Sequence, residues 1–247
     1  MNLGRLGRRY ALALWPLLVM AQATARPTVV ELYTSEGCSS CPPAERYLGE
    51  LAGRPDVLAL SFHVDYWDDL GWRDPWALRL FSARQSTYVR QLGLSTPFTP
   101  QAIVDGRESY VGSDRSRIGP RLGKSQPELS VKVVRENGEL VISVGAEPKP
   151  TDVVLIPFRR RVRSSIGRGE NAGRTLEEFN VARGFRTLGR TGAEPVQWRV
   201  SLGSLPQDAT DVAVLAQRAE QGEVLGAAQV EIVPLQERVV DATSVTE

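Results

Sequence analysis

The sequence predicts an α/β domain followed by an all-β domain, and two observations carry this prediction. A strand, a helix and a second strand follow one another between residues 28 and 64, which makes a βαβ unit. After residues 125–127 the hydrophobic period changes to two, with short strands and turn signals typical of an antiparallel β-sandwich. The chain has 247 residues, enough for two such domains. We place the α/β domain at 26–124, the sandwich-like domain at 127–235 and a flexible tail at 236–247.

The βαβ unit is defined by two strands and the helix between them. Thr28–Tyr33 alternates and contains β-branched residues, which predicts a strand. Pro42 and Pro43 suit the first turn of a helix, where an N–H group can be spared, and Ala44–Leu51 continues it. Val57–Val64 is an almost unbroken apolar run, which favours a central parallel strand covered on both faces.

Three further elements complete the α/β domain. Asp74-Pro75 is an N-cap and first-turn signal, and the helix that it starts should run to about Leu92. The strands Gln101–Val104 and Glu108–Val111 flank an Asp-Gly hairpin turn. Ser113 is placed to cap a last short helix.

The all-β domain begins with a hairpin around Asn137-Gly138, flanked by strands at 131–135 and 139–144. Further strands are predicted at Val153–Phe158, Gln197–Leu202, Val212–Gln217 and Gly226–Val233. This half also contains a loop in which glycines flank Glu170 and Asn171. We expect this loop to do no more than pack against the first domain.

The N-terminal segment predicts export. Three arginines precede the apolar run Tyr10–Met20, and small residues follow, so residues 1–25 form a secretory signal peptide cleaved after Ala25 or, alternatively, after Ala23. An uncleaved anchor is disfavoured because the run is short of the roughly 20 residues that span a bilayer. We therefore expect a periplasmic or secreted protein with no membrane span after cleavage. The net charge of +1 gives no reason to expect nucleic acid as a partner.

Cys38 and Cys41 are the only cysteines, and they form a C-x-x-C on the turn between the first strand and the helix. This placement is typical of a redox site, because a helix N-terminus stabilises a thiolate. Cys38 is then the nucleophile and Cys41 the resolving thiol, with their redox-active disulfide in place of any cofactor. The two serines between them can donate hydrogen bonds to the thiolate. A structural disulfide is the alternative, but so short a loop gives little stabilisation.

Four stretches carry a family resemblance: E-L-Y-T-S-E-G-C-S-S-C-P-P-A-E, H-V-D-Y-W-D, T-P-Q-A-I-V-D-G and G-R-G-E-N-A-G-R-T-L-E-E-F-N-V-A-R. They are similar to a bacterial secreted thioredoxin-like family of unknown function, within the thioredoxin superfamily. The resemblance implies a thioredoxin-like fold and a cis-proline that faces the cysteines and shapes the substrate groove. Pro100 matches that position better than Pro97. Gly37 and the two serines depart from thioredoxin itself, which leaves redox potential and direction open.

His63, the only histidine, ends the second strand, where α/β sheets place their sites. It either packs beside the strand end, or tunes Cys38 and shuttles a proton. A third interpretation makes Cys38, Cys41 and His63 a metal site, as in thioredoxin-like copper chaperones. Asp65 lies two residues further on an extended segment, so it should share the face of His63 and accept a proton when Cys41 attacks.

Three functional hypotheses follow. The leading one is an exported thiol–disulfide oxidoreductase that acts on thiol- or disulfide-containing proteins or on small thiols, together with an unidentified redox partner. The second is a metal-binding (copper) chaperone. The third is a non-catalytic secreted binding protein in which the β-sandwich does the work.

Overall fold

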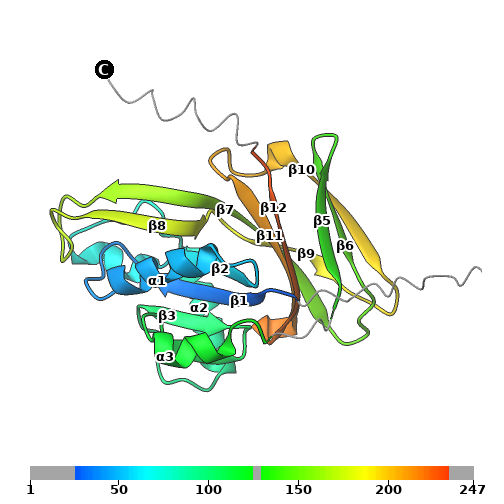
Figure 1. The fold of residues 1–247 in the computed structure, drawn as a ribbon, viewed down its shortest axis with the longest axis horizontal. Helices are drawn as coiled ribbons and strands as arrows, with labels where there is room; N and C mark the ends of the chain where they lie inside the picture. Colours follow the sequence, from blue (N-terminus) through cyan, green and yellow to red (C-terminus); the bar gives the residue numbers. More distant parts are fainter. Residues whose placement is uncertain (1–25, 125–128, 234–247) are drawn as a thin grey trace, which may run out of the picture.

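A computed structural model describes residues 26–124 and 129–233, so the predicted signal peptide, the residues that separate the two predicted domains and the whole predicted tail lie outside the described residues. The fold is mixed α/β. One large mixed sheet has nine strands in the order β12-β11-β7-β8-β2-β1-β3-β4, with β9 beside β7. A small antiparallel sheet has the order β10-β6-β5, and Figure 1 shows it at the end of the molecule opposite the helices.

The first half of the described chain follows the predicted order of elements. These are β1 (Thr28–Thr34), α1 (Pro42–Ala52), β2 (Val57–His63), the short 3₁₀ helix η1 (Asp65–Leu70), α2 (Arg79–Gln91), β3 (Gln101–Val104), β4 (Glu108–Val111), α3 (Arg115–Ile118) and η2 (Gly119–Arg121). β1 pairs with β2 in parallel and with β3 antiparallel. The predicted βαβ unit and the following hairpin are therefore confirmed.

Two predicted helix starts are wrong. α2 begins at Arg79 and not at Pro75, because the Asp74 carboxylate does not cap a helix: one oxygen accepts the Trp76 N–H, and the other accepts the Glu36 N–H and contacts His63. The N-cap of α3 is Asp114 rather than Ser113, since its carboxylate accepts the Arg117 N–H at 3.1 Å. In both places a tertiary or neighbouring acceptor outweighs the local signal.

The second half adds strands that the hydrophobic pattern does not reveal. Its elements are β5 (Val131–Glu136), β6 (Glu139–Val144), β7 (Thr151–Ser165), β8 (Thr175–Ala182), β9 (Arg186–Arg190), β10 (Val196–Ser201), η3 (Leu202–Ser204), β11 (Asp211–Arg218), η4 (Ala219–Gln221) and β12 (Val224–Glu231). β8 and β9 were not predicted, because β8 carries charged residues and buries two of its polar side chains, Glu178 and Asn180.

β8 joins the two halves of the chain into one sheet. It pairs in parallel with β2, with Ser61 opposite Val181, and antiparallel with β7 along most of its length. The Asn180 side chain strengthens this junction by donating to the Ala59 carbonyl at 2.8 Å. The second half is therefore continuous with the first through the sheet, an arrangement that is compatible with two domains, although the predicted limits at 124 and 127 stay a prediction.

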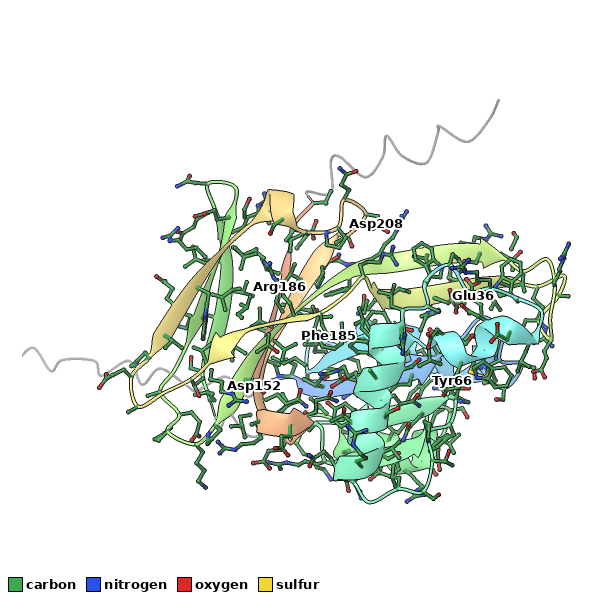
Figure 2. The ribbon with its side chains drawn as sticks, turned by 180° about the vertical axis from the view of Figure 1, so that it is seen from behind. Glu36, Tyr66, Asp152, Phe185, Arg186 and Asp208 are labelled. Carbon is green, nitrogen blue, oxygen red and sulfur yellow. A yellow bond between two sulfur atoms is a disulfide. The ribbon has the colours of Figure 1, made fainter. Side chains whose placement is uncertain are left out.

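Apolar side chains fill both faces of the large sheet. α1 covers one face of β1, β2 and β3, and α2 covers the opposite face together with the second-half strands. Along β7 the side chains alternate: Val154 and Ile156 face the α2 core, and Val153 and Leu155 face the small sheet. Figure 2 shows α2 lying across the sheet with Phe185 beside it. Among the described residues, no helix has the length and apolarity needed to cross a bilayer.

Candidate functional site

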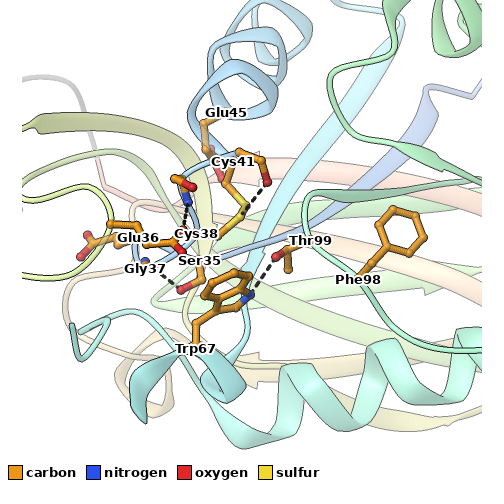
Figure 3. The surroundings of a disulfide bond; sticks show 12 residues. Ser35, Glu36, Gly37, Cys38, Cys41, Glu45, Trp67, Phe98 and Thr99 are labelled. Atoms are coloured by element: carbon orange, nitrogen blue, oxygen red, sulfur yellow. Dashed lines mark hydrogen bonds between the residues drawn. A yellow bond between two sulfur atoms is a disulfide. The ribbon is translucent and has the colours of Figure 1, made fainter. Parts of the chain in front are cut away.

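The two cysteines form a disulfide at the junction between β1 and α1. Their Cα atoms are 5.5 Å apart, and Cys41 is the N-cap of α1, directly before the two prolines of the first turn (Figure 3). Prolines lack the N–H groups that a first turn leaves unpaired, so this sequence fixes where the helix begins. The relative exposure of Cys38 is 0% and that of Cys41 is 1%. The disulfide is thus placed at a helix N-terminus and is covered.

Local hydrogen bonds hold the loop that carries Cys38. The Cys38 N–H donates to the Ser35 carbonyl at 3.1 Å, and the Gly37 N–H donates to Ser35 Oγ at 3.0 Å. Ser40 Oγ lies 3.3 Å from Cys38 Sγ, as the serines between the cysteines led us to expect. A Cβ at Gly37 would be 3.3 Å from Trp67 Cβ, so the glycine leaves room for this tryptophan beside the disulfide.

Trp67 connects the disulfide loop to the predicted proline. Its indole Nε1 donates to Thr99 Oγ1 at 2.8 Å, and Figure 3 shows the indole between Thr99 and the loop of Cys38. The Thr99–Pro100 peptide bond is cis. Pro100 precedes β3, which pairs directly with β1. The structure therefore brings Pro100 to the same end of the sheet as the cysteines.

The Gly-flanked loop between β7 and β8 packs against the loop that carries the two cysteines, so it contacts the first half as expected. The buried Asn171 amide donates to the carbonyl oxygens of Glu36 and Cys38, at 2.8 and 3.0 Å. The Ser39 N–H donates to Glu170 Oε2 at 3.1 Å. Trp72 donates to Glu36 Oε2 at 2.6 Å on the same side. Glu170 and Asn171, 131 to 135 positions away in sequence, thereby hydrogen-bond to the loop that carries the cysteines.

His63 is fully buried and lies among carboxylates. Its Nδ1 is 2.7 Å from Asp74 Oδ2, and its Nε2 is 3.9 Å from Glu178 Oε1. Glu45, one turn along α1 from Cys41, completes a group with His63 and Glu178 in which the potential ligand atoms lie within 4.8 Å of one another. Neither cysteine belongs to that group. The structure thus brings His63 together with carboxylate oxygens.

The pKa values in this cluster are shifted because charges are held away from water. Burial lowers the pKa of His63, but the carboxylates of Asp74, Glu178 and Glu45 outweigh it and raise the value to about 10. Burial raises the pKa of Glu45 and, strongly, that of Glu178. Burial also acts to raise the pKa of Asp74, yet His63 and two backbone N–H groups hold it below its ordinary value. The net charge of this buried cluster therefore depends on several groups that influence one another.

Asp65, the predicted proton acceptor, lies elsewhere. Its backbone N–H donates to Ser82 Oγ at 3.1 Å and its carboxylate pairs with the same hydroxyl, so it faces α2. Asp74 takes the place beside His63 that was expected for Asp65. Sequence reasoning missed Asp74, Glu45 and Glu178 as site residues. Glu45 was open to detection from the four-residue spacing to Cys41, which puts both on one helix face.

A pocket of about 420 Å³ opens between α1 and β8 beside this cluster. Cys41, Glu45 and Glu178 all contribute to its wall, together with Gly49 and Phe179. The pocket therefore connects the neighbourhood of the disulfide to the buried carboxylates. It forms from α1 of the first half and β8 of the second half.

Comparison with known proteins shows the family to which the chain belongs. The chain matches the model of DUF1223, described as a protein of unknown function, over residues 29–217, and it belongs to that family. The crystal structure of a protein from Agrobacterium tumefaciens, a structural genomics target, shares 31% identity at a TM-score of 0.74, covering 84% of this chain and 95% of that one. HBP35 of Porphyromonas gingivalis has 13% identity and a TM-score of 0.56, covering 84% and 76%. No curated protein matches the chain significantly.

Proposed function

We propose that this protein is an exported thiol–disulfide oxidoreductase of the thioredoxin type. The observation that carries the proposal is the Cys38–Cys41 disulfide at the N-terminus of α1, at the same sheet end as the cis Thr99–Pro100 bond. Helix N-termini stabilise a thiolate, which is the reactive form in disulfide exchange. A structural role explains the pair less well, because a loop closed across two intervening residues stabilises a fold only weakly.

In the oxidising direction, a substrate thiolate attacks Cys38 Sγ. The Cys38–Cys41 bond breaks, and Cys41 leaves as a thiolate at the helix N-terminus. A second substrate thiolate then attacks the substrate sulfur of the mixed disulfide, and Cys38 leaves as a thiolate. The substrate has gained one disulfide and the protein holds two thiols, so two electrons have moved. The reducing direction runs these steps backwards, and a second thiol or disulfide partner restores the starting state.

Surrounding groups support this assignment of roles. The Ser40 hydroxyl, 3.3 Å from Cys38 Sγ, can donate a hydrogen bond to a Cys38 thiolate. Cys41 lies on the helix and on the wall of the pocket between α1 and β8, where a leaving thiolate meets the N-terminal dipole. Trp67 and Thr99, which are joined by a hydrogen bond, lie beside the disulfide on the other side. Cys38 is therefore the sulfur attacked, and Cys41 the one that leaves.

Trapping distinguishes the two cysteines. In the reducing direction, Cys41→Ser should accumulate a mixed disulfide with a reducible protein such as insulin, whereas Cys38→Ser should form none and lose turnover. Ser39→Ala, between the cysteines, is the control and should keep activity. If Cys38→Ser reduces insulin or reactivates scrambled ribonuclease at the wild-type rate, the proposal fails. The redox potential of the pair then sets the direction: a value of about −270 mV indicates a reductase and about −120 mV an oxidant.

A further inference from the structure

Unsatisfied polar atoms gather at one place in the interior. Among the described residues, six buried side-chain polar atoms have no hydrogen-bond partner: Arg26 Nε, Thr34 Oγ1, Glu36 Oε1, Glu45 Oε2, His63 Nε2 and Glu178 Oε2. All but the arginine atom belong to residues of the His63 cluster or of the β1 end beside it, where Thr34 is the register partner of His63. Native interiors pair nearly all such atoms, so a concentration of this kind marks a place where a bound ion or a water would be stabilised.

We propose that Glu45, His63 and Glu178 bind a divalent transition-metal ion, of which Zn²⁺ is the best fit. One nitrogen and two carboxylate groups converge, with one potential ligand atom of each residue within 4.8 Å of the others. Two ligands of one ion lie roughly 3 to 4 Å apart when each is about 2.1 Å from it. The 3.9 Å between His63 Nε2 and Glu178 Oε1 already falls in that range.

Supporting contacts behind these three residues are already in place. Asp74 Oδ2 lies 2.7 Å from His63 Nδ1, which accounts for one ring nitrogen and leaves Nε2 directed at the cluster. Ser61 Oγ donates to Glu45 Oε1 at 2.9 Å, and the Thr34 hydroxyl interacts with the same carboxylate without a well-formed hydrogen bond to Oε2. A carboxylate on the far nitrogen of a metal-binding histidine, and hydrogen bonds on metal-binding carboxylates, are the usual support of such sites.

The charges in the cluster favour a cation. Glu36, Glu45, Asp74 and Glu178 are all buried, and His63 is the basic side chain that lies within 4 Å of two of them, Asp74 and Glu178. Buried carboxylates that lack a partner are costly. A divalent ion would compensate two negative charges and satisfy the unpaired oxygens at the same time.

The donor set also indicates which ion and how it enters. Imidazole with carboxylates suits zinc, manganese and iron(II), whereas copper(I) prefers sulfur ligands, which this group lacks. Three protein ligands leave a coordination position for water or a substrate. Glu45 and Glu178 line the pocket between α1 and β8, so that position faces a route to solvent. This site is independent of the proposed redox chemistry, because no cysteine takes part.

The test measures Zn²⁺ binding to the full mature chain after chelator treatment, by calorimetry and metal analysis. We expect one Zn²⁺ per chain, bound by a Cys38→Ser/Cys41→Ser variant as tightly as by the oxidised wild type. Glu178→Gln and His63→Gln should each weaken binding at least 100-fold, and Asp74→Asn, which acts through His63, by about 10- to 100-fold. Glu177→Gln is the matched control: it is the exposed neighbour of Glu178 on β8, and binding should not change.

Three results would overturn the proposal. One is the absence of Zn²⁺ binding to folded, chelator-treated wild type at micromolar concentrations, with Mn²⁺ equally unbound. Another is equal affinity in Glu178→Gln and Glu177→Gln. The third is binding that disappears in the cysteine-free variant, which would place the ion on sulfur. Circular dichroism of each variant shows that it is folded, and if His63→Gln does not fold, Glu178→Gln, which keeps the shape of the side chain, decides alone.

Discussion

The side-chain amide of Asn171 donates a hydrogen bond to the carbonyl oxygen of Cys38 at 3.0 Å, across 133 residues of sequence. The same amide donates to the Glu36 carbonyl at 2.8 Å, and Asn171 itself is fully buried. A residue of the second half thus restrains the backbone of the first cysteine. Because Cys38 has no exposed surface, a reagent reaches the disulfide only after a local movement, and we expect the hydrogen bonds of Asn171 to restrain that movement.

Asn171→Ala should therefore accelerate reduction of the disulfide by dithiothreitol. The variant removes two hydrogen bonds that restrain this movement, each contributing about 1 kcal/mol, so the open form should become about 5- to 30-fold more populated. The measurement is the rate at which both thiols become available to a maleimide mass label. The dithiothreitol concentration is chosen so that the loop opens and closes much faster than the reductant attacks.

Gln217→Ala is the control for a general loss of stability. Gln217 is also a buried amide, and it donates to the Gly222 carbonyl at 2.8 Å without touching the disulfide loop. The disulfide of the Gln217→Ala variant should be reduced at the wild-type rate. Equal acceleration in both variants would show that reduction follows global unfolding, and the restraining role of Asn171 would be wrong.

The sequence predicted the part of the fold that local pattern determines. The apolar run at 57–64, the Pro-Pro start of α1 and the two Gly-containing hairpins became elements close to their expected bounds, because each depends on neighbours in the chain. β8 was not predicted, because the burial of Glu178 and Asn180 depends on partners that only the folded chain supplies. The same reason explains why Asp74, and not Asp65, stands beside His63: Asp74 is held by Glu36, which is 38 residues away.

Ser40→Ala should slow alkylation of the reduced protein by iodoacetamide at neutral pH. The Ser40 hydroxyl is the side-chain donor 3.3 Å from Cys38 Sγ, and it stabilises the thiolate over the thiol. Loss of about 1 kcal/mol from this hydrogen bond reduces the thiolate fraction, and with it the rate, by roughly 5-fold. Mass spectrometry of the peptide that contains Cys38 gives the rate. Ser39→Ala, whose site faces Glu170, should leave it unchanged, and the prediction fails if both serines have the same effect.

Arg84→Met should destabilise the protein strongly, because Arg84 is the partner of a buried acid. Its guanidinium donates to both oxygens of Glu31, at 2.7 and 2.9 Å, and to Gln217 of β11 at 3.0 Å. The substitution leaves Glu31 buried without its cation, which costs about 3 to 5 kcal/mol. Urea denaturation measures the free energy of unfolding.

Two further variants isolate this effect of charge burial. Adding Glu31→Gln to Arg84→Met should recover part of the loss, since the amide carries no charge and its oxygen can still accept a hydrogen bond from the buried Tyr33 or Tyr88 hydroxyl. Arg115→Met removes the exposed Arg115–Glu50 pair and should change stability little. A double variant no more stable than Arg84→Met alone would show that the arginine acts through packing against Phe62 and Phe185 instead.

The pocket beside Cys41 depends on a glycine in α1. A Cβ at Gly49 would lie 2.5 Å from the ring of Phe179 on β8, so α1 approaches β8 closely only because this residue has no side chain. Alanine favours a helix by about 1 kcal/mol over glycine, but overpacking of this size costs about 1 to 3 kcal/mol, so Gly49→Ala should lower the free energy of unfolding. Gly53→Ala is the control, because its Cβ would meet only the Glu50 carbonyl, at 3.5 Å, and its φ of −81° suits alanine.

The sign of the Gly49 effect should reverse when the ring is removed. In a Phe179→Ala background the clash is gone, only the helix preference remains, and Gly49→Ala should then stabilise the protein by up to about 1 kcal/mol. Because the same approach of α1 to β8 sets Glu45 near Glu178, Gly49→Ala alone should also weaken Zn²⁺ binding, while Gly53→Ala should not. Denaturation and calorimetry on the four variants measure both quantities. A Gly49→Ala protein as stable as wild type would mean that the contact with Phe179 does not set the spacing between α1 and β8.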